Sequence, residues 1–416
     1  MTRTAPERTR ARRPVPGPRL VLLLGPAFVA AIAYVDPGNV AANLTAGARY
    51  GYLLVWVLVA ANLIAVLVQY QSAKLGLVTG RSLPELLGQR LPTGRRRAFW
   101  VQAELIAAAT DLAEVIGGAI ALHLLFGIPL VAGGVIVGLV SIGLLAVQSR
   151  HGQRPFEIVI GALLLVITVG FLTGLVVSPL SGSGIAGGLV PRFDGPDSVL
   201  LAASMLGATV MPHAVYLHSS LSRDRHGAQT DEGVLRRLLR ATRWDVIAAL
   251  AVAGAVNISM LLIAAASLGG VPGTDSIEGA HAAITASLGP VVGVVFAVGL
   301  LASGLASTSV GAYAGAAIMG GLLHVRVPLL ARRVVTLIPA LAILAIGVEP
   351  TTALVVSQVV LSLGIPFALV PLIRLTGDRR VMGAHVDRPL TRAAAWVAVS
   401  LVVVLNVALV VLTVTG

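Results

Sequence analysis

Residues 33–39 read Ala-Tyr-Val-Asp-Pro-Gly-Asn, and this stretch decides the fold of the chain. It lies inside the first long apolar segment, where a carboxylate such as Asp36 costs about 2.5–3.5 kcal/mol to place in a bilayer. Pro37 removes a backbone donor and Gly38 frees the chain to leave the helix, so the pair predicts a break. Carbonyls freed at that depth persist only inside protein or along a cavity. A break that carries Asp36 and Asn39 is therefore a candidate cation site; the alternative is a proline kink with a satisfied carboxylate.

Composition places the chain among membrane proteins. Of its 416 residues, 56% are hydrophobic and 12% are charged, whereas soluble domains carry about 25% charged residues. Apolar segments close to the roughly 20-residue length of a membrane span recur from one end to the other. The absence of cysteine excludes disulfides and thiolate metal centres. The sequence thus predicts an all-α, polytopic protein of the cell membrane.

The apolar segments predict eleven membrane spans. A short surface helix is expected at residues 277–288, in an outer loop, and the segment at residues 222–243 is expected to face the cytoplasm. The spans are expected at residues 20–47, 52–78, 98–125, 129–148, 156–178, 199–221, 244–268, 290–322, 334–348, 352–373 and 393–414.

The basic residues indicate how these spans are oriented. With a cytoplasmic amino terminus, 28 of the 30 Lys and Arg residues fall in cytoplasmic segments, and only Arg49 and Arg192 fall outside. The net charge of +12 therefore reports topology and contact with anionic lipid, not nucleic-acid binding. An odd number of spans predicts an outer carboxyl terminus. No small-residue cleavage site precedes the break, so the first span is interpreted as uncleaved.

A second break is predicted in the sixth span, where Pro212 interrupts an apolar helix directly after Met211. Five spans separate Pro212 from Pro37, so the two breaks lie in helices of opposite direction. Interrupted segments at corresponding places in two halves indicate an inverted-repeat transporter with its site near the midplane. The expected units are a basic cytoplasmic tail at 1–19, a first repeat (spans one to five) at 20–178, a second repeat (spans six to ten) at 199–373 and an additional span at 393–414.

The two breaks together gather a mixed set of metal ligands. Asp36 brings a carboxylate, Asn39 an amide oxygen and Met211 a thioether, while carbonyls freed near Ala33 and Ala208 add oxygens. Oxygen ligands alone suit Mg²⁺, Ca²⁺ or Mn²⁺. A soft sulfur favours Mn²⁺, Fe²⁺, Co²⁺ or Cd²⁺ instead. Methionine is often core filler, but the position of Met211 next to the break proline favours the ligand role.

The third span carries a second constellation, formed by Glu104, Asp111 and Glu114. The three carboxylates are spaced seven and three residues apart and lie near one helical face. They must face the bundle interior or water, and chains of Asp, Glu and His inside a membrane mark proton relays. His213 and His218, just past the second break, are candidates to join or to be screened by this set. The alternative is a structural polar network.

Several partners remain open at this point. Arg332 and Arg333 are candidate partners of the carboxylates or simple topology markers. Gln358 in the tenth span either reaches the metal site from behind the ligands or bonds between helices. Gly311 and Gly315 in the eighth span indicate close helix packing. The hydroxyl of Ser303 and its neighbours line a pathway or bond within their own helix.

The sequence resembles the Nramp family of proton-coupled divalent metal transporters over nearly its whole length. The resemblance rests on four short motifs in the right order: DPGN at 36–39, ATDLAE at 109–114, GQR at 152–154 and MPH at 211–213. It implies a leucine-transporter-like fold with a five-plus-five inverted repeat and broken helices 1 and 6. It also implies metal ligation by Asp36, Asn39, Met211 and the carbonyls of Ala33 and Ala208, and a proton route through Asp111, Glu114, Glu104, His213 and Arg333.

The chain departs from the family pattern at Ala214, Leu305 and Gly364, where the family usually has Asn, Gln and Gln. These departures concern gating and ligation from position 364, and they leave the ligands named above intact. Family branches that prefer Mg²⁺ or Al³⁺ lack the methionine of the sixth span, so Met211 argues against those ions.

We therefore predict a secondary transporter that imports Mn²⁺, or Fe²⁺ and related divalent metals, with protons by alternating access. It is expected to function as a monomer without a permanently bound cofactor. No HExxH, GxSxG or GxxxxGK[ST] motif occurs, so an enzyme has no support. One alternative is an amino-acid or Na⁺-coupled carrier on the same fold, although Asp36 would repel a substrate carboxylate. The other is a metal-sensing membrane protein, which would not need the carboxylates of the third span.

Overall fold

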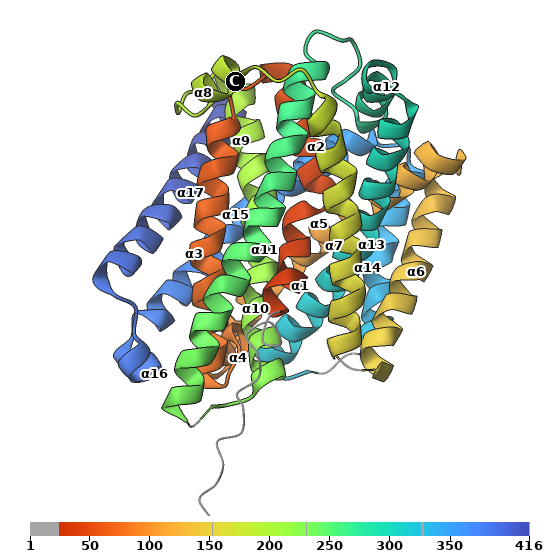
Figure 1. Cartoon of the computed structure of the whole chain (residues 1–416). Helices are drawn as coiled ribbons and strands as arrows, with labels where there is room; N and C mark the ends of the chain where they lie inside the picture. The colour runs from red at the N-terminus through yellow and green to blue at the C-terminus, as the bar shows by residue number, and fades with distance from the viewer. Residues whose placement is uncertain (1–24, 152, 230, 326–327, 416) are drawn as a thin grey trace, which may run out of the picture.

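The computed structural model describes residues 25–151, 153–229, 231–325 and 328–415. All secondary structure in these ranges is helical, and the long helices run side by side as one bundle (Figure 1). This confirms the prediction of an all-α protein, because a helix satisfies its backbone polar groups within one segment and so can cross a bilayer. The predicted tail at 1–19 and the motif at 152–154 lie outside the part of the chain whose side chains are described.

Eleven segments of the described chain correspond to the eleven predicted spans. The first span consists of α1 (Pro26–Ile32), a 3-10 turn η2 (Ala33–Val35) and α2 (Pro37–Tyr50), and the sixth consists of α9 (Gly195–Thr209) and α10 (Pro212–His226). The other spans are α3 (Val55–Thr79), α5 (Thr93–Phe126), α6 (Leu130–His151), α7 (Gln153–Val177), α11 (Glu232–Ser267), α13 (Pro290–Leu323), α14 (Leu329–Ala345), α15 (Pro350–Thr376) and α17 (Pro389–Thr415).

Short helices cover the two ends of the bundle. They are α4 (Leu83–Arg90), α8 (Gly182–Gly188), α12 (Ile277–Leu288), α16 (Arg379–Met382) and the 3-10 turn η3 (Gly383–His385). The predicted surface helix at 277–288 is confirmed as α12. In Figure 1, α8 and α12 lie at the upper end, whereas α4 and α16 lie at the lower end.

The segment at 222–243, which is expected to face the cytoplasm, is largely helical. α10 continues to His226, and α11 already begins at Glu232. Asp231 caps α11 by accepting two backbone N–H groups of its first turn. Hydropathy marks where a helix enters the apolar layer, whereas hydrogen bonding and capping mark where the helix ends, so α10 and α11 extend beyond the predicted spans.

Both predicted helix breaks are present, each with a proline at the first position of the following helix. At the first break the backbone of Asp36 is extended, with ψ 169°, between η2 and α2. At the second, Met211 is extended, with φ −69° and ψ 121°, before Pro212. Proline lacks a backbone donor and fits the start of a helix, where no intrahelical acceptor is needed. The chain therefore restarts at each proline.

The halves of the two broken spans pack in opposite order. α1 contacts α10 and α2 contacts α9, while η2 also contacts α9. In Figure 1, α2 and α9 form the upper halves, and α1 and α10 form the lower halves. This is the arrangement expected when two repeats have opposite directions in the membrane.

Two prolines also interrupt the backbone hydrogen bonds of α15, and side chains of neighbouring helices donate to the carbonyls that are freed. Pro366 cannot bond the carbonyl of Ser362, and this oxygen instead accepts from Asn406 Nδ2 of α17 at 2.8 Å. Pro371 frees the carbonyl of Phe367, which accepts the hydroxyl of Tyr216 of α10 at 3.3 Å. Hydrogen bonds from α17 and α10 therefore hold α15 at the two positions where its own backbone hydrogen bonds are missing.

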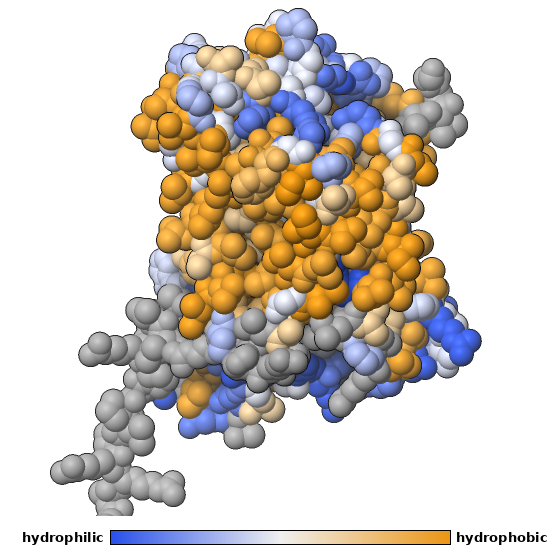
Figure 2. Space-filling view, turned by 90° about the vertical axis from the view of Figure 1, so that its right-hand side faces the viewer, coloured by the Kyte–Doolittle hydropathy of each residue, from blue (hydrophilic) through white to orange (hydrophobic). Residues whose placement is uncertain are grey.

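An apolar belt surrounds the middle of the molecule, with hydrophilic residues gathered at both ends (Figure 2). Large exposed apolar side chains lie on the outer helices, as at Ile158 of α7, Val335 of α14 and Val404 of α17. The broken span α9–α10 is the opposite case. Of its most apolar 18 residues 94% are buried, whereas 33% of the corresponding residues of α17 are buried. The sixth span thus lies inside the bundle, whereas α17 faces the bilayer.

Candidate functional site

The Asp36 carboxylate is completely buried at the first break. Its Oδ1 accepts the Asn39 backbone N–H at 2.7 Å and so caps α2. Its Oδ2 has no hydrogen-bond partner, and neither has the side-chain amide of Asn39. Among the described residues no Lys, Arg or His pairs with Asp36. Each unpartnered buried polar atom costs about 1–3 kcal/mol, so the arrangement fits the binding of a cation.

Gln358 of α15 bridges the two breaks. Its side chain lies against Gly38, where an added Cβ would be 1.8 Å from Nε2. Its backbone carbonyl lies against Gly207 of α9, where an added Cβ would be 2.1 Å away. The side chain is fully buried and its Oε1 has no partner. The amide expected behind the metal ligands therefore lies between the broken helices, in space that only glycine leaves open.

Met211 is fully buried at the second break, immediately before α10. Ala208 lies in the last turn of α9, one residue before this helix ends. Ala33 is the first residue of η2, the turn that contacts α9. With Asp36 and Asn39 at the start of α2, the structure brings all five predicted ligands to two breaks that contact each other.

The ligand types available at the breaks are chemically mixed. In the part of the chain that the structure describes, no group of three or more His, Cys, Asp or Glu side chains is placed to hold a metal ion. A metal at the breaks must therefore use a single carboxylate together with amide, carbonyl and thioether groups. Fewer charged ligands give weaker binding of a divalent ion. Such a site can therefore release its ion again.

Asp111 of α5 and Arg333 of α14 form a buried ion pair. Arg333 Nη1 lies 3.4 Å from Asp111 Oδ1, and the two side chains are 0% and 1% exposed. Arg333 Nε also donates to Ser141 Oγ of α6 at 2.8 Å. Removal of one partner from such a pair leaves an uncompensated buried charge. The pair therefore ties α5, α6 and α14 together around one carboxylate.

Glu114 lies between this ion pair and the first break. It is buried and interacts electrostatically with both Asp111 and Asp36. One turn further along α5, Gly117 packs on Pro37, where an added Cβ would be 2.0 Å from the proline Cβ. α5 thus touches the break itself. Its carboxylates form a row that leads from the break toward the amino-terminal end of α5.

A second ion pair lies nearer that end of α5. Glu104 Oε1 accepts from Arg332 Nη2 of α14 at 2.6 Å. An added Cβ at Gly315 of α13 would be 2.1 Å from the Arg332 guanidinium, and one at Gly311 would be 3.1 Å from Glu114 Oε2. The two glycines predicted to bring helices together therefore also make room for charged side chains between them.

The two histidines of α10 contact different helices. His213 Nδ1 lies 3.4 Å from Thr110 Oγ1 of α5, and the ring interacts electrostatically with Asp111. His218 Nδ1 lies 2.7 Å from Gln69 Oε1 of α3. Five residues on a helix turn the side chain by about 140° around the axis. His213 therefore faces the carboxylate row, whereas His218 faces α3.

Two neutral side chains hold the first break in shape. Ser303 Oγ of α13 donates to the carbonyl of Val35 at 2.5 Å, and Asn257 Nδ2 of α11 donates to that of Tyr34 at 2.6 Å. Both bonds satisfy backbone acceptors at the end of η2, directly before the break. Asn257, which sequence reasoning missed, also accepts from Asn43 Nδ2 of α2 at 2.8 Å. The available signal was a lone amide in an apolar span, which does not reveal its partner.

The end of α1 that is predicted to face the cytoplasm is held closed. Asp245 of α11 accepts the backbone N–H groups of Gly25 at 3.1 Å and Ala27 at 3.0 Å. Nearby, Arg225 of α10 forms an ion pair with Glu157 of α7. None of the five predicted metal ligands is more than 1% exposed. The structure therefore represents a state in which the ligands are shielded from both sides of the membrane.

Comparison with known proteins places this geometry in a family. A family profile described as natural resistance-associated macrophage protein-like (Nramp) matches residues 27–412. The chain belongs to the Nramp family. The resemblance drawn from the short motifs around the two breaks is thereby confirmed.

Two Nramp relatives match along most of the chain. The divalent metal cation transporter MntH of Mycobacterium tuberculosis is 61% identical over 394 residues, which cover 95% of this chain and 92% of the relative. The crystal structure of an Eremococcus coleocola manganese transporter has a TM-score of 0.84 at 33% identity, covering 93% of this chain and 85% of that one. Both relatives are transporters, in agreement with the prediction that this Nramp protein is not an enzyme.

The Nramp chain shares its fold with more distant proteins as well. The structure of MhsT in complex with L-phenylalanine has a TM-score of 0.58 at 16% identity and covers 93% of this chain and 97% of that one. At this identity the likeness concerns the fold alone. Together with the manganese transporter structure it confirms the predicted leucine-transporter-like fold.

Proposed function

We propose that this Nramp protein is a secondary transporter that imports Mn²⁺ and related divalent transition metals, including Fe²⁺, together with protons. The observation that carries the proposal is the Asp36 carboxylate, buried at a helix break without a counter-ion and beside unpartnered amide atoms. A charge in that position requires a partner of opposite sign. The names of the M. tuberculosis and E. coleocola relatives, a divalent metal cation transporter and a manganese transporter, support the choice of ion.

We assign the transported ion to the space between the two breaks. Asp36 supplies the charge, Asn39 and the carbonyls of Ala33 and Ala208 supply neutral oxygens, and Met211 supplies sulfur. The thioether disfavours Ca²⁺ and Mg²⁺, which prefer oxygen ligands alone. Gln358, packed against both broken helices, supports the site from α15.

We assign the proton route to the carboxylate row of α5. Glu114 adjoins Asp36, and Asp111 follows beside Arg333 and His213. Glu104, paired with Arg332, lies next on the same helical face. We leave His218 out of this route because its ring is bound to Gln69 on another helix.

Alternating access would move the two broken helices against the rest of the bundle. In this proposal residues 20–178 and 199–373 act as the inverted repeats, and 393–414 is a peripheral addition. The amino terminus is placed in the cytoplasm and the carboxyl terminus outside, because the basic residues gather on one side. The transporting unit is a monomer.

The proposal is tested by uptake into proteoliposomes that contain the full-length protein. A metal-sensitive dye and a pH-sensitive dye inside the vesicles report Mn²⁺ entry and acidification. Mn²⁺ uptake is expected to rise when the outside is made acidic, and the lumen should acidify as Mn²⁺ enters. Metal entry without acidification would contradict proton coupling, and binding without entry would contradict transport.

The same assay tests the role of the thioether in ion selectivity. In Met211→Ala, Mn²⁺ uptake should persist, but Ca²⁺ or Mg²⁺ should compete about tenfold better, because the remaining oxygens suit hard ions. Met205→Ala is the matched control, since Met205 is equally buried in α9 but lies away from the break. Equal competition in wild type and Met211→Ala would remove Met211 from the site.

A further inference from the structure

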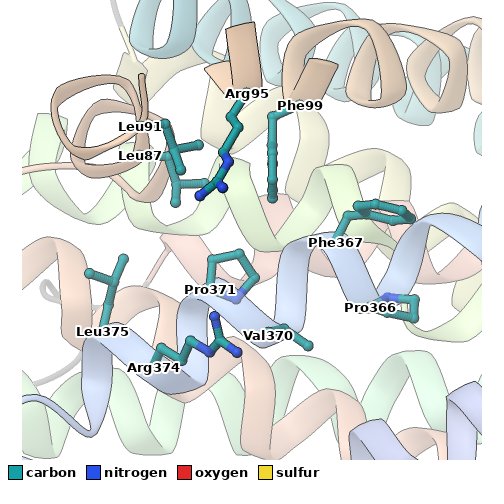
Figure 3. A pocket seen from close by; sticks show the side chains of 10 residues that line it. All are labelled: Leu87, Leu91, Arg95, Phe99, Pro366, Phe367, Val370, Pro371, Arg374 and Leu375. Carbon is teal, nitrogen blue, oxygen red and sulfur yellow. The ribbon is translucent and has the colours of Figure 1, made fainter. Parts of the chain in front are cut away.

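A pocket of about 520 Å³ lies between the α4–α5 segment and α15, and none of its described lining residues lies at either break (Figure 3). Its walls are mostly apolar and include Leu91, Phe99 and Val370. Two arginines, Arg95 of α5 and Arg374 of α15, reach toward one another across it. Among the residues that the structure describes, no acidic side chain lines the pocket. It therefore combines an apolar wall with two positive charges, a pattern that neither the metal site nor the proton route uses.

The pocket forms where α5 and α15 separate. Deeper in the bundle the two helices touch closely, because an added Cβ at Gly364 would be 2.7 Å from Ile106 of α5. Below that contact Phe99 and Phe367 meet edge to face, with ring centroids 6.2 Å apart. The pocket begins at this aromatic pair and extends to Arg374, near the end of α15. Its charged end thus lies at the polar boundary of the membrane.

The two arginines are available to a ligand. Both are exposed, and within the described part of the chain neither forms an ion pair. Their neighbour Arg90 differs, because it lies 4.0 Å from Asp378. The guanidinium group presents several N–H donors in a plane and binds phosphate oxygens in pairs. Two such groups facing one space form a receptor for a phosphate.

The apolar wall continues into the surface that faces the bilayer. Val356, Val360, Leu363 and Phe367 are all exposed and are spaced four, three and four residues apart on α15. This spacing forms one stripe along the helix, and the stripe ends in the pocket at Phe367. A ligand with an apolar chain can therefore lie on the stripe with its charged end between the arginines.

We propose that this pocket binds one anionic phospholipid, with its phosphate between Arg95 and Arg374 and one acyl chain along α15. Basic pockets between membrane helices are suited to acidic head groups. Pro366 and Arg374 are separated by about 12 Å along the helix axis, which fits the upper part of an acyl chain below its head group. The continuous apolar stripe favours a lipid over a soluble anion, because a soluble anion would leave that wall unused.

Native mass spectrometry of the full-length protein in detergent tests this proposal without metal or a pH gradient. Phosphatidylglycerol and phosphatidylcholine with identical acyl chains are titrated separately and in competition. The wild type should retain one phosphatidylglycerol about tenfold more tightly than phosphatidylcholine. Because the readout is lipid binding, its failure would not affect the proposed transport function.

Arg95→Gln combined with Arg374→Gln should abolish the preference for phosphatidylglycerol. Arg237→Gln combined with Arg240→Gln is the matched control, since it removes two exposed charges from α11, outside the pocket, and it should keep the preference. Val370→Trp retains both pocket arginines but fills the apolar wall, and it should weaken the binding of both lipids.

Three outcomes would overturn the proposal. The first is a preference for phosphatidylglycerol that survives in the Arg95/Arg374 variant. The second is a preference lost equally in the Arg237/Arg240 control, which would indicate general attraction to the basic face. The third is displacement of the lipid by inorganic phosphate at equal concentration, which would indicate an anion site without an acyl chain.

Discussion

The two buried acidic regions of the bundle differ in what surrounds their carboxylates. At the first break Asp36 faces amide groups, and no described cation pairs with it. On α5, in contrast, Asp111 lies beside Arg333 and Glu104 beside Arg332. A carboxylate without a counter-ion attracts a metal cation, whereas a guanidinium beside a carboxylate already balances its charge and so weakens its attraction for a second cation. The surroundings, not the carboxylate itself, distinguish the proposed metal site from the proposed proton route.

Glu114 connects the two regions. It interacts electrostatically with Asp36 on one side and with Asp111 on the other. All three side chains are buried, where charges act on one another with little screening. A charge that arrives at one region is therefore felt at the other, and such coupling is reciprocal. The comparison predicts different losses when each region is altered.

The largest effect is expected from Asp36→Asn. The amide keeps the cap on α2, because asparagine is a good N-cap residue, but the only charge among the proposed ligands is lost. Mn²⁺ uptake into proteoliposomes should fall by at least about 100-fold, more than the loss typical for residues that only support a ligand. Asp197→Asn, an exposed carboxylate at the start of α9, should transport normally. Substantial Mn²⁺ uptake by Asp36→Asn would refute a metal site at this break.

A selective effect is expected from Asp111→Asn. The stimulation of uptake by a pH gradient should drop by about tenfold, in the range of a coupling between two sites, while the KM for Mn²⁺ changes less. Uptake rates measured from pH 5 to pH 8 would separate the two quantities. Glu278→Gln, on the surface helix α12, serves as the control. A pH profile identical to that of wild type would remove Asp111 from the proton route.

The smallest effect is expected from Ser303→Ala. It removes the hydrogen bond to the carbonyl of Val35 and should destabilise the fold by about 1 kcal/mol. Thermal unfolding of the full-length protein in detergent measures the change. Ser307→Ala is the control, because its hydroxyl bonds within α13 to the carbonyl of Ser303 and its loss should matter less. Equal stability of Ser303→Ala and wild type would show that the break needs no support from α13.

The helices and their breaks were predictable because their signals are local. Proline at positions 37 and 212 forces the chain to restart wherever the rest of the protein lies. The surface helix α12 was predicted with the same bounds that the structure has. The apolar pattern did not locate the ends of α10 and α11 within 222–243, because helical turns outside the membrane do not need apolar residues.

The sequence by itself determined the spans, the two breaks and the types of side chain at them, because the cost of burying polar groups in lipid acts on each segment separately. Only the tertiary structure decided which side chains meet: Gln358 with both breaks, Arg333 with Asp111, and His213 rather than His218 with α5. These contacts depend on the rotation and offset of one helix against another. Packing between distant segments sets this rotation and this offset. The glycines Gly38 and Gly207 then leave the space in which Gln358 packs against both broken helices.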